Sequence, residues 1–212
     1  MSSSTTQPST SASTSANPKR HSILPPISQS GPKPPVTFSS SLTIADSAVL
    51  TGTNPISISS ESVIHPRARL DSMGGAITIG RRCIIHERTR IGYMGSEGRI
   101  LLGEGNKAVT LGDYVTVEVA AVVEAGGTVL GEGTTVGAGS RVGRGAVVGK
   151  YCTITPQSEV PGGARIPDFT VVYGIGMRRQ DKRGVTALMN NAQKQQIAVL
   201  RRLIPSKPEK FQ

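Results

Sequence analysis

Aliphatic residues recur at every sixth position through the middle of the chain. Glycine often follows the aliphatic residue directly, and a residue that is nearly always small comes four positions after it. A period of six fits neither the three-and-four spacing of a helix nor the alternation of a half-buried strand. It is the hexapeptide repeat of a parallel β-helix. The series reads Ile58, Ile64, Leu70, Ile79, Ile85, Ile91, Leu111, Val117, Val123, Leu130, Val136, Val142, Val148 and Ile154.

Three such hexads supply three short strands and three turns, which close one triangular coil. The aliphatic side chain points inward, and the small residue fills the tight corner. Residues 42–175 are therefore predicted to stack into about seven coils, an all-β solenoid. Known hexapeptide proteins coil left-handed, and the resemblance to them implies a left-handed parallel β-helix here.

The segments that flank this domain have different patterns. Residues 1–41 are rich in Ser, Thr and Pro and contain no acidic residue, so we expect a disordered tail. Between Ile91 and Leu111 the period is lost, which predicts an excursion loop over about 92–110. Residues 176–212 are predicted to form a basic linker and then an amphipathic helix from about Val185 to Ile204, whose apolar stripe suits a helix lying on another surface.

The net charge of +10 comes entirely from these flanks. Residues 1–41 carry +3 and residues 176–212 carry +7, whereas residues 42–175 contain twelve basic and twelve acidic residues. A folded nucleic-acid module would carry a basic face with stacking aromatics, so no nucleic-acid partner is expected. The sequence shows no apolar run that could span a bilayer and no secretory signal, which predicts a cytoplasmic protein without membrane insertion.

The two cysteines, Cys83 and Cys152, occupy small corner positions of the repeat. They lie several coils apart, and we expect a reducing compartment, so no disulfide is predicted. We expect both thiols to be buried and inert.

Histidine is the residue type on which catalysis by a hexapeptide prism would depend. Zinc carbonic anhydrases of this fold use three histidine ligands, whereas this chain has only His21, His65 and His86. Where the carbonic-anhydrase pattern places its ligands, this chain has Gly92, Val119 and Glu124. Neither a metal site nor a bound cofactor is therefore expected.

His65 and His86 each follow an inward residue, so they should face outward one coil apart. Either could serve as the base of an acyltransferase. The sequence places no carboxylate partner beside them, and we therefore expect no catalytic residues.

Two stretches resemble a particular family. VIHPRARL (63–70) and VVYGIGMRR (171–179), together with the coil core and the C-terminal helix, resemble the dynactin subunit 6 family over about residues 42–204. The Ser/Thr-rich extension falls outside this resemblance. The resemblance implies a non-enzymatic structural subunit of cytoplasm and cytoskeleton, which pairs with the related dynactin subunit 5. Its further partners would be subunit 4 and an actin-related protein in the pointed-end complex, and indirectly dynein during microtubule-based transport.

The last coil and the basic segment after it are the expected contact surface for such partners. The candidate residues are Ile166, Phe169, Val172, Tyr173, Arg178 and Arg179. The alternative is a divergent hexapeptide enzyme, either carbonic-anhydrase-like or acyltransferase-like. That alternative predicts bound zinc or acyl-coenzyme A, and loss of activity on His65→Ala or His86→Ala.

Overall fold

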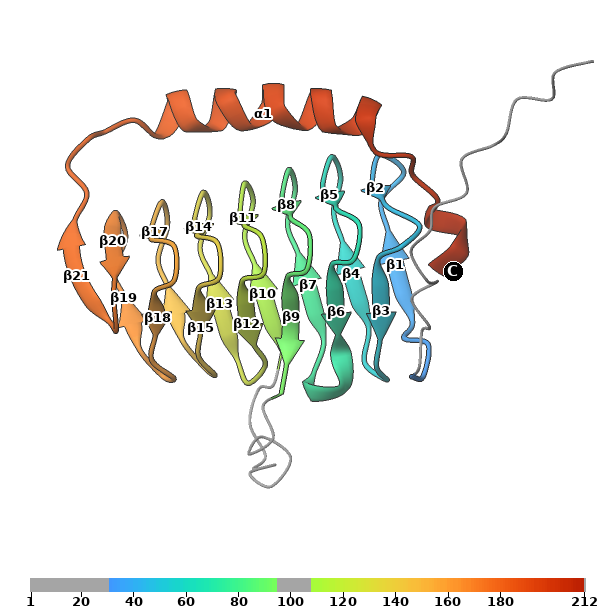
Figure 1. Cartoon of the computed structure of the whole chain (residues 1–212), viewed down its shortest axis with the longest axis horizontal. Helices are drawn as coiled ribbons and strands as arrows, with labels where there is room; N and C mark the ends of the chain where they lie inside the picture. Colours follow the sequence, from blue (N-terminus) through green and yellow to red (C-terminus); the bar gives the residue numbers. More distant parts are fainter. Residues whose placement is uncertain (1–30, 95–107, 212) are drawn as a thin grey trace, which may run out of the picture.

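The chain folds into a three-sided prism of stacked coils with one long helix lying along it (Figure 1). The computed structural model describes residues 31–94 and 108–211. The predicted fold, a left-handed parallel β-helix with a C-terminal helix, is confirmed. Within the described residues, no helix is both long enough and apolar enough to cross a membrane.

Each side of the prism is one sheet, in which every strand except β21 pairs in parallel with a strand one coil away. The first sheet contains β1 (Val36–Phe38), β4 (Ile56–Ile58), β7 (Ile77–Ile79), β10 (Val109–Leu111), β13 (Thr128–Leu130), β16 (Val147–Val148) and β19 (Arg165–Ile166). The second contains β2 (Thr43–Ile44), β5 (Val63–Ile64), β8 (Ile84–Ile85), β11 (Thr116–Val117), β14 (Thr135–Val136), β17 (Thr153–Ile154), β20 (Thr170–Tyr173) and β21 (Met177–Gln180). The third contains β3 (Val49–Thr51), β6 (Arg69–Asp71), β9 (Arg90–Tyr93), β12 (Val122–Glu124), β15 (Arg141–Val142) and β18 (Glu159–Val160).

The aliphatic series fills the interior of the prism. In the second sheet, Ile64 pairs with Ile85 and Ile85 with Val117, so identical hexad positions stack directly above one another. All three side chains are fully buried. The register is fixed because a slip of one residue would turn these side chains outward to water.

The small corner residues do more than fill volume. Ser62 Oγ donates a hydrogen bond to the carbonyl of Gly80 at 2.8 Å, and Thr134 Oγ1 donates to Gly149 at 2.8 Å. Both side chains are completely buried. Each therefore joins neighbouring coils while satisfying a backbone carbonyl that water cannot reach.

The helix α1 (Thr186–Leu203) ends one residue before the predicted end at Ile204 and lies over the second sheet (Figure 1). Its buried residue Ile197 packs with Leu200 and Ile204 against Val63 and Ile84, which face outward from β5 and β8. The helix therefore packs on its own prism.

The described segments extend the predicted coil domain in both directions. Strand β1 begins at Val36, inside the stretch expected to be a tail, because Val36 and Phe38 pair with β4 and pack on the core. Strand β21 lies in the expected linker and pairs antiparallel with β20. Residues 1–30 of the expected tail and most of the expected excursion loop lie outside the described residues. A short 3-10 helix, η1 (Ser72–Gly74), follows β6.

The two ends of the prism are covered differently. At the first coil, the C-terminal segment returns to the prism, where Lys207 donates its backbone N–H to Ile44 and Ser206 Oγ accepts from the N–H of Ile44. Phe211, in the 3-10 helix η3 (Pro208–Phe211), is almost fully buried in the main core. At the last coil, β21 pairs with the free edge of β20.

Candidate functional site

A ladder of polar side chains follows the second sheet at the corner that leads to the third sheet. His65, His86 and Glu118 each come directly after an inward residue of β5, β8 and β11, and these inward residues stack in register. The imidazole rings of His65 and His86 lie 4.6 Å apart between centroids, tilted by 30°. We call these three residues the corner ladder. The prediction that both histidines share one face, one coil apart, is confirmed.

Partial burial is the main cause of a lowered pKa in both histidines. Partial burial lowers the pKa of the His65 imidazole, and the neighbouring imidazole of His86 lowers it further. Burial also lowers the pKa of His86, although the carboxylates of Glu118 and Glu87 oppose the shift. Both rings are therefore biased toward the neutral form, which is the form that can accept a proton.

One nitrogen of the ladder lacks a partner. His65 Nε2 is buried and has no hydrogen-bond partner among the described residues. A buried imidazole nitrogen without a hydrogen-bond partner destabilises the folded state unless a ligand or another hydrogen-bond donor reaches it.

Glu118 is the residue that the sequence analysis missed. It follows Val117 just as His86 follows Ile85, and the register Val117↔Ile85 places it one coil beyond His86. Its Oε2 accepts a hydrogen bond from the backbone N–H of Ala138 at 2.9 Å, which fixes the carboxylate. The location of Glu118 could have been predicted from its hexad position, because all residues that directly follow an inward aliphatic residue of one sheet lie at the same corner.

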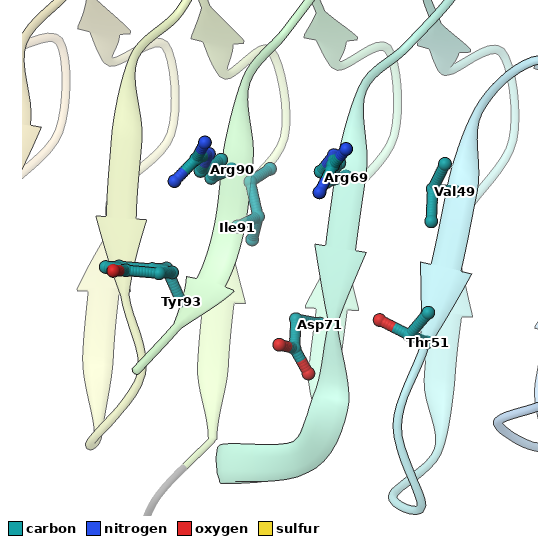
Figure 2. Close-up of a pocket in the computed structure, with 7 residues that line it drawn as sticks. All are labelled: Val49, Thr51, Arg69, Asp71, Arg90, Ile91 and Tyr93. Atoms are coloured by element: carbon teal, nitrogen blue, oxygen red, sulfur yellow. The ribbon is translucent and has the colours of Figure 1, made fainter. Parts of the chain in front are cut away.

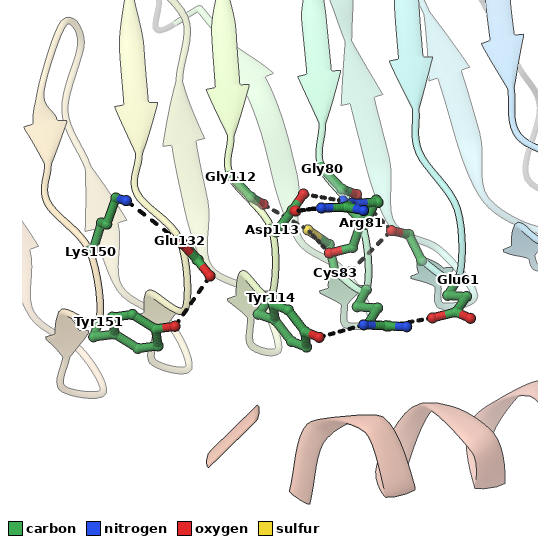
Figure 3. A network of polar contacts seen from close by, with 12 residues as sticks. Glu61, Gly80, Arg81, Cys83, Gly112, Asp113, Tyr114, Glu132, Lys150 and Tyr151 are labelled. Carbon is green, nitrogen blue, oxygen red and sulfur yellow. Dashed lines mark hydrogen bonds and ion pairs between the residues drawn. The ribbon is translucent and has the colours of Figure 1, made fainter. Parts of the chain in front are cut away.

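A second polar cluster lies under α1, where the first sheet turns into the second (Figure 3). Arg82 donates to Glu61 and, at 2.5 Å, to the hydroxyl of Tyr114, so three successive coils are linked. From the helix, Gln193 donates to the Arg82 carbonyl at 2.9 Å, and Asn190 donates to the Tyr151 hydroxyl at 3.1 Å. These contacts position the helix on the prism.

The cysteines are free and buried, and the prediction that they form no disulfide is confirmed. Burial raises the pKa of the Cys83 thiol to about 12, so it stays protonated at physiological pH. Cys83 Sγ lies 3.1 Å from the Gly112 carbonyl, the same kind of corner contact that Ser62 makes one coil earlier. Neither thiol is a candidate nucleophile.

The described residues contain no group of three or more His, Cys, Asp and Glu side chains that could hold a metal ion. The two imidazoles and the nearby carboxylate of the corner ladder are groups that can transfer protons.

The residues expected to form the partner surface differ in their exposure. Ile166 and Val172 are inward hexad residues and are buried in the core, so their side chains cannot meet a partner. Phe169 and Tyr173 are about two-fifths exposed, at 42% and 39%. Phe169 stacks on Tyr151 of the preceding coil with ring centroids 5.8 Å apart.

The basic pair of that surface lies on β21. Arg178 and Arg179 are exposed, and Arg178 donates to the carbonyl of Arg165 at 2.8 Å. Sequence reasoning missed two more exposed apolar residues at this end, Ile175 and Met177. They belong to no hexad, so the repeat gave no sign of them.

The fold defines a class of protein, the hexapeptide-repeat β-helix proteins. A solved structure from Bacillus cereus, described as an acetyltransferase, matches with a TM-score of 0.66 and 21% identity, over 80% of this chain and 91% of that chain. A hexapeptide transferase family protein from Anaplasma phagocytophilum matches with a TM-score of 0.58 and 18% identity, over 79% of this chain and 95% of the other. No protein-family model and no curated protein matches the chain.

These neighbours correct one expectation of the sequence analysis. The chain was expected not to be an enzyme, and this is contradicted because both structures are described as transferases. The expectation rested in part on finding no carboxylate beside either histidine, whereas Glu118 lies one coil beyond His86. At these identities the likeness shows the fold alone.

Proposed function

We propose that the chain is a hexapeptide-repeat acyltransferase in which His86 of the corner ladder acts as general base. The observation that carries the proposal is the stacked pair of half-buried imidazoles, both with a lowered pKa, on a coil next to the carboxylate of Glu118. A general base works best when it is neutral at the operating pH and held in place. The likeness of the fold to the two transferases supports the same class.

The reaction would follow from these groups. The neutral imidazole of His86 accepts the proton of an acceptor amine or hydroxyl as that group attacks the carbonyl carbon of an acyl thioester. The carbon–sulfur bond breaks, the sulfur leaves as a thiolate, and the imidazolium returns the proton to it. Glu118 stabilises the imidazolium formed in between, because an opposite charge on the neighbouring coil favours the protonated form.

The test is release of free thiol from acetyl-coenzyme A by the full chain, with a panel of small amines and alcohols as acceptors. We expect His86→Ala to lower the rate by about a hundredfold, the usual contribution of a positioned base. His21→Ala, outside the described residues, is the control and should leave the rate unchanged. If no acceptor gives turnover above the spontaneous rate, or if His86→Ala keeps full activity, the proposal is wrong.

A second candidate function is supported by the last coil. We propose that this end of the prism binds a partner protein, as the resemblance to the dynactin subunit 6 family implies. Phe169, Tyr173, Ile175 and Met177 are exposed there. They come from β20, β21 and the adjoining turns, and the conspicuous motif VVYGIGMRR spans the same strands. Large apolar side chains gathered at a solenoid end are typical of a protein contact.

Affinity purification from native cytosol with mass spectrometry tests this second proposal. We expect recovery of a dynactin subunit 5-like hexapeptide protein together with subunit 4 and an actin-related protein. Ile175→Asp with Met177→Asp should abolish recovery, whereas Thr78→Asp, at an exposed position in the middle of the first sheet, should not. Recovery without any dynactin subunit would contradict it.

A further inference from the structure

The outer face of the third sheet carries a shallow groove that neither proposal uses (Figure 2). It has a volume of about 310 Å³ and crosses three neighbouring strands, β3, β6 and β9. Its lining residues are Val49, Thr51, Arg69, Asp71, Arg90, Ile91 and Tyr93. A volume of this size is at the lower end of the range for small-molecule sites.

Two arginines stand side by side in this groove. Arg69 and Arg90 are register partners on the adjacent parallel strands β6 and β9, so their backbones are about 4.8 Å apart. Both side chains are exposed. Figure 2 shows their guanidinium groups projecting from the same face of the sheet. Like charges at facing positions of neighbouring strands repel each other.

Three other arginines of the prism have a carboxylate partner. Arg81 pairs with Asp113 at 2.7 Å, Arg82 pairs with Glu61, and Arg141 of the same third sheet pairs with Glu124. Among the described residues, Arg69 and Arg90 form no ion pair. The guanidinium group of Arg90 lies over the ring of Tyr93, with 5.6 Å from the guanidinium carbon to the ring centroid. Within the described part of the chain, two guanidinium groups thus share one groove with no carboxylate ion-paired to either.

The remaining polar groups lie farther along the same strands. Asp71 lies two residues after Arg69, and its Oδ1 accepts the backbone N–H of Met73 at 2.9 Å, which fixes the carboxylate. Thr51 is its register partner on β3. Figure 2 shows Asp71 and Thr51 together, away from the two guanidinium groups. The groove therefore has a basic half and a hydroxyl-accepting half.

We propose that this groove binds a small phosphate ester of a polyhydroxy compound. The phosphate lies between Arg69 and Arg90, because planar guanidinium groups bind phosphate oxygens through paired hydrogen bonds and the added charge relieves their repulsion. The hydroxyl groups of the ligand donate to Asp71 and pair with Thr51. Arg67 and Arg88, in the turns two residues before Arg69 and Arg90, are two further basic residues close in sequence.

The test is isothermal titration calorimetry of the full chain at low salt and pH 7.5, with ribose 5-phosphate and inorganic phosphate as probes. We expect saturable binding of the ester. Arg69→Gln and Arg90→Gln should each weaken it at least tenfold. Arg81→Gln removes the same charge from an arginine already paired with Asp113 and should leave the affinity unchanged.

The outcomes separate the parts of the proposal. The absence of saturable binding would overturn it, as would an equal loss of affinity in Arg81→Gln, because binding would then follow net charge alone. Ester binding that is tighter than that of inorganic phosphate, and that Asp71→Asn weakens, supports the hydroxyl-accepting half. Equal affinity for the two probes would overturn that half. The measurement is of binding alone, so failure of the acyl-transfer assay leaves it unaffected.

Discussion

At the scale of single residues, the position within the hexad decides what a side chain can do. Ile85 points into the core and His86, the next residue, stands at a corner where it meets His65 from one coil away. Glu118 reaches the same corner from the following coil. Functional groups on such a prism are therefore collected across coils, from residues about twenty or more positions apart.

The corner histidines give the protein a pH dependence of stability. Both have a pKa below the ordinary value of about 6.5, so the folded state binds fewer protons than the unfolded chain in the window just below that pH. The two neutral histidines therefore contribute fully to the free energy of unfolding above about pH 6.5. This contribution is lost as the pH falls below that value. We expect the melting temperature to fall from pH 7 to pH 5, and to fall less in the double variant His65→Asn, His86→Asn. An equal fall in both proteins would contradict the burial argument.

A glycine of β9 shows how closely the coils approach. Gly92 has φ +80°, and a Cβ placed on it would lie 2.1 Å from the Asp71 carbonyl oxygen, a backbone atom that cannot move aside. Gly163 has φ +68° but no atom within 4 Å of the same position. We expect Gly92→Ala to cost about 3 kcal/mol or more, from backbone strain plus the clash, and Gly163→Ala about 1 kcal/mol. Urea denaturation measures the free energy of unfolding of both variants. A similar loss in the two variants would contradict the predicted clash at Gly92.

At the scale of elements, α1 is held by two kinds of contact. Its first half is joined to the prism by hydrogen bonds from Asn190 and Gln193. Its second half is joined by the apolar contact of Ile197 with Val63 and Ile84. Apolar burial of this kind contributes most of the helix docking free energy, since hydrogen bonds near the surface exchange with water at little net gain.

The helix can therefore be loosened at one residue. Ile197 is 4% exposed, whereas Val199, on the outer face, is 57% exposed. We expect Ile197→Ala to cost about 2 to 3 kcal/mol of docking free energy and Val199→Ala less than about 0.5 kcal/mol. Hydrogen exchange of the backbone amides in α1 reports the difference, because the helix can open while the prism stays folded. Unchanged exchange in Ile197→Ala would show that the polar contacts alone hold the helix.

The sequence predicted the strands of the repeat because inward residues of the prism must be apolar at every sixth position. It predicted α1 because an uninterrupted apolar stripe ends at Pro205. It missed β1 and β21, since a strand that pairs on one side at the end of a solenoid needs no complete hexad. The groove at Arg69 and Arg90 was also missed, because its residues come together only through register across separate coils.

At the scale of the whole molecule, stacked coils form a rigid prism whose weakness is its ends. A solenoid exposes unpaired backbone N–H and C=O groups at its first and last coils, and such edges pair with other chains unless they are covered. This chain covers its first coil with its own C-terminal segment: Phe211 packs in the core beside the first coils, and Lys207 is hydrogen-bonded to Ile44. Helix α1 carries the chain back along the prism to reach that coil (Figure 1).

Removal of this cover should therefore cause association. We expect a chain truncated after Ile204 to aggregate, which size-exclusion chromatography with light scattering would detect. Phe211 is only 3% exposed, so Phe211→Ala should cost about 3 kcal/mol, the lower end for a buried aromatic residue. Lys207→Ala is the matched control, because its side chain is exposed and the backbone bond to Ile44 remains. A truncated chain that stayed monomeric with an unchanged melting temperature would mean that the first coil protects its own edge. The C-terminal segment would then owe its position to the docking of α1 alone.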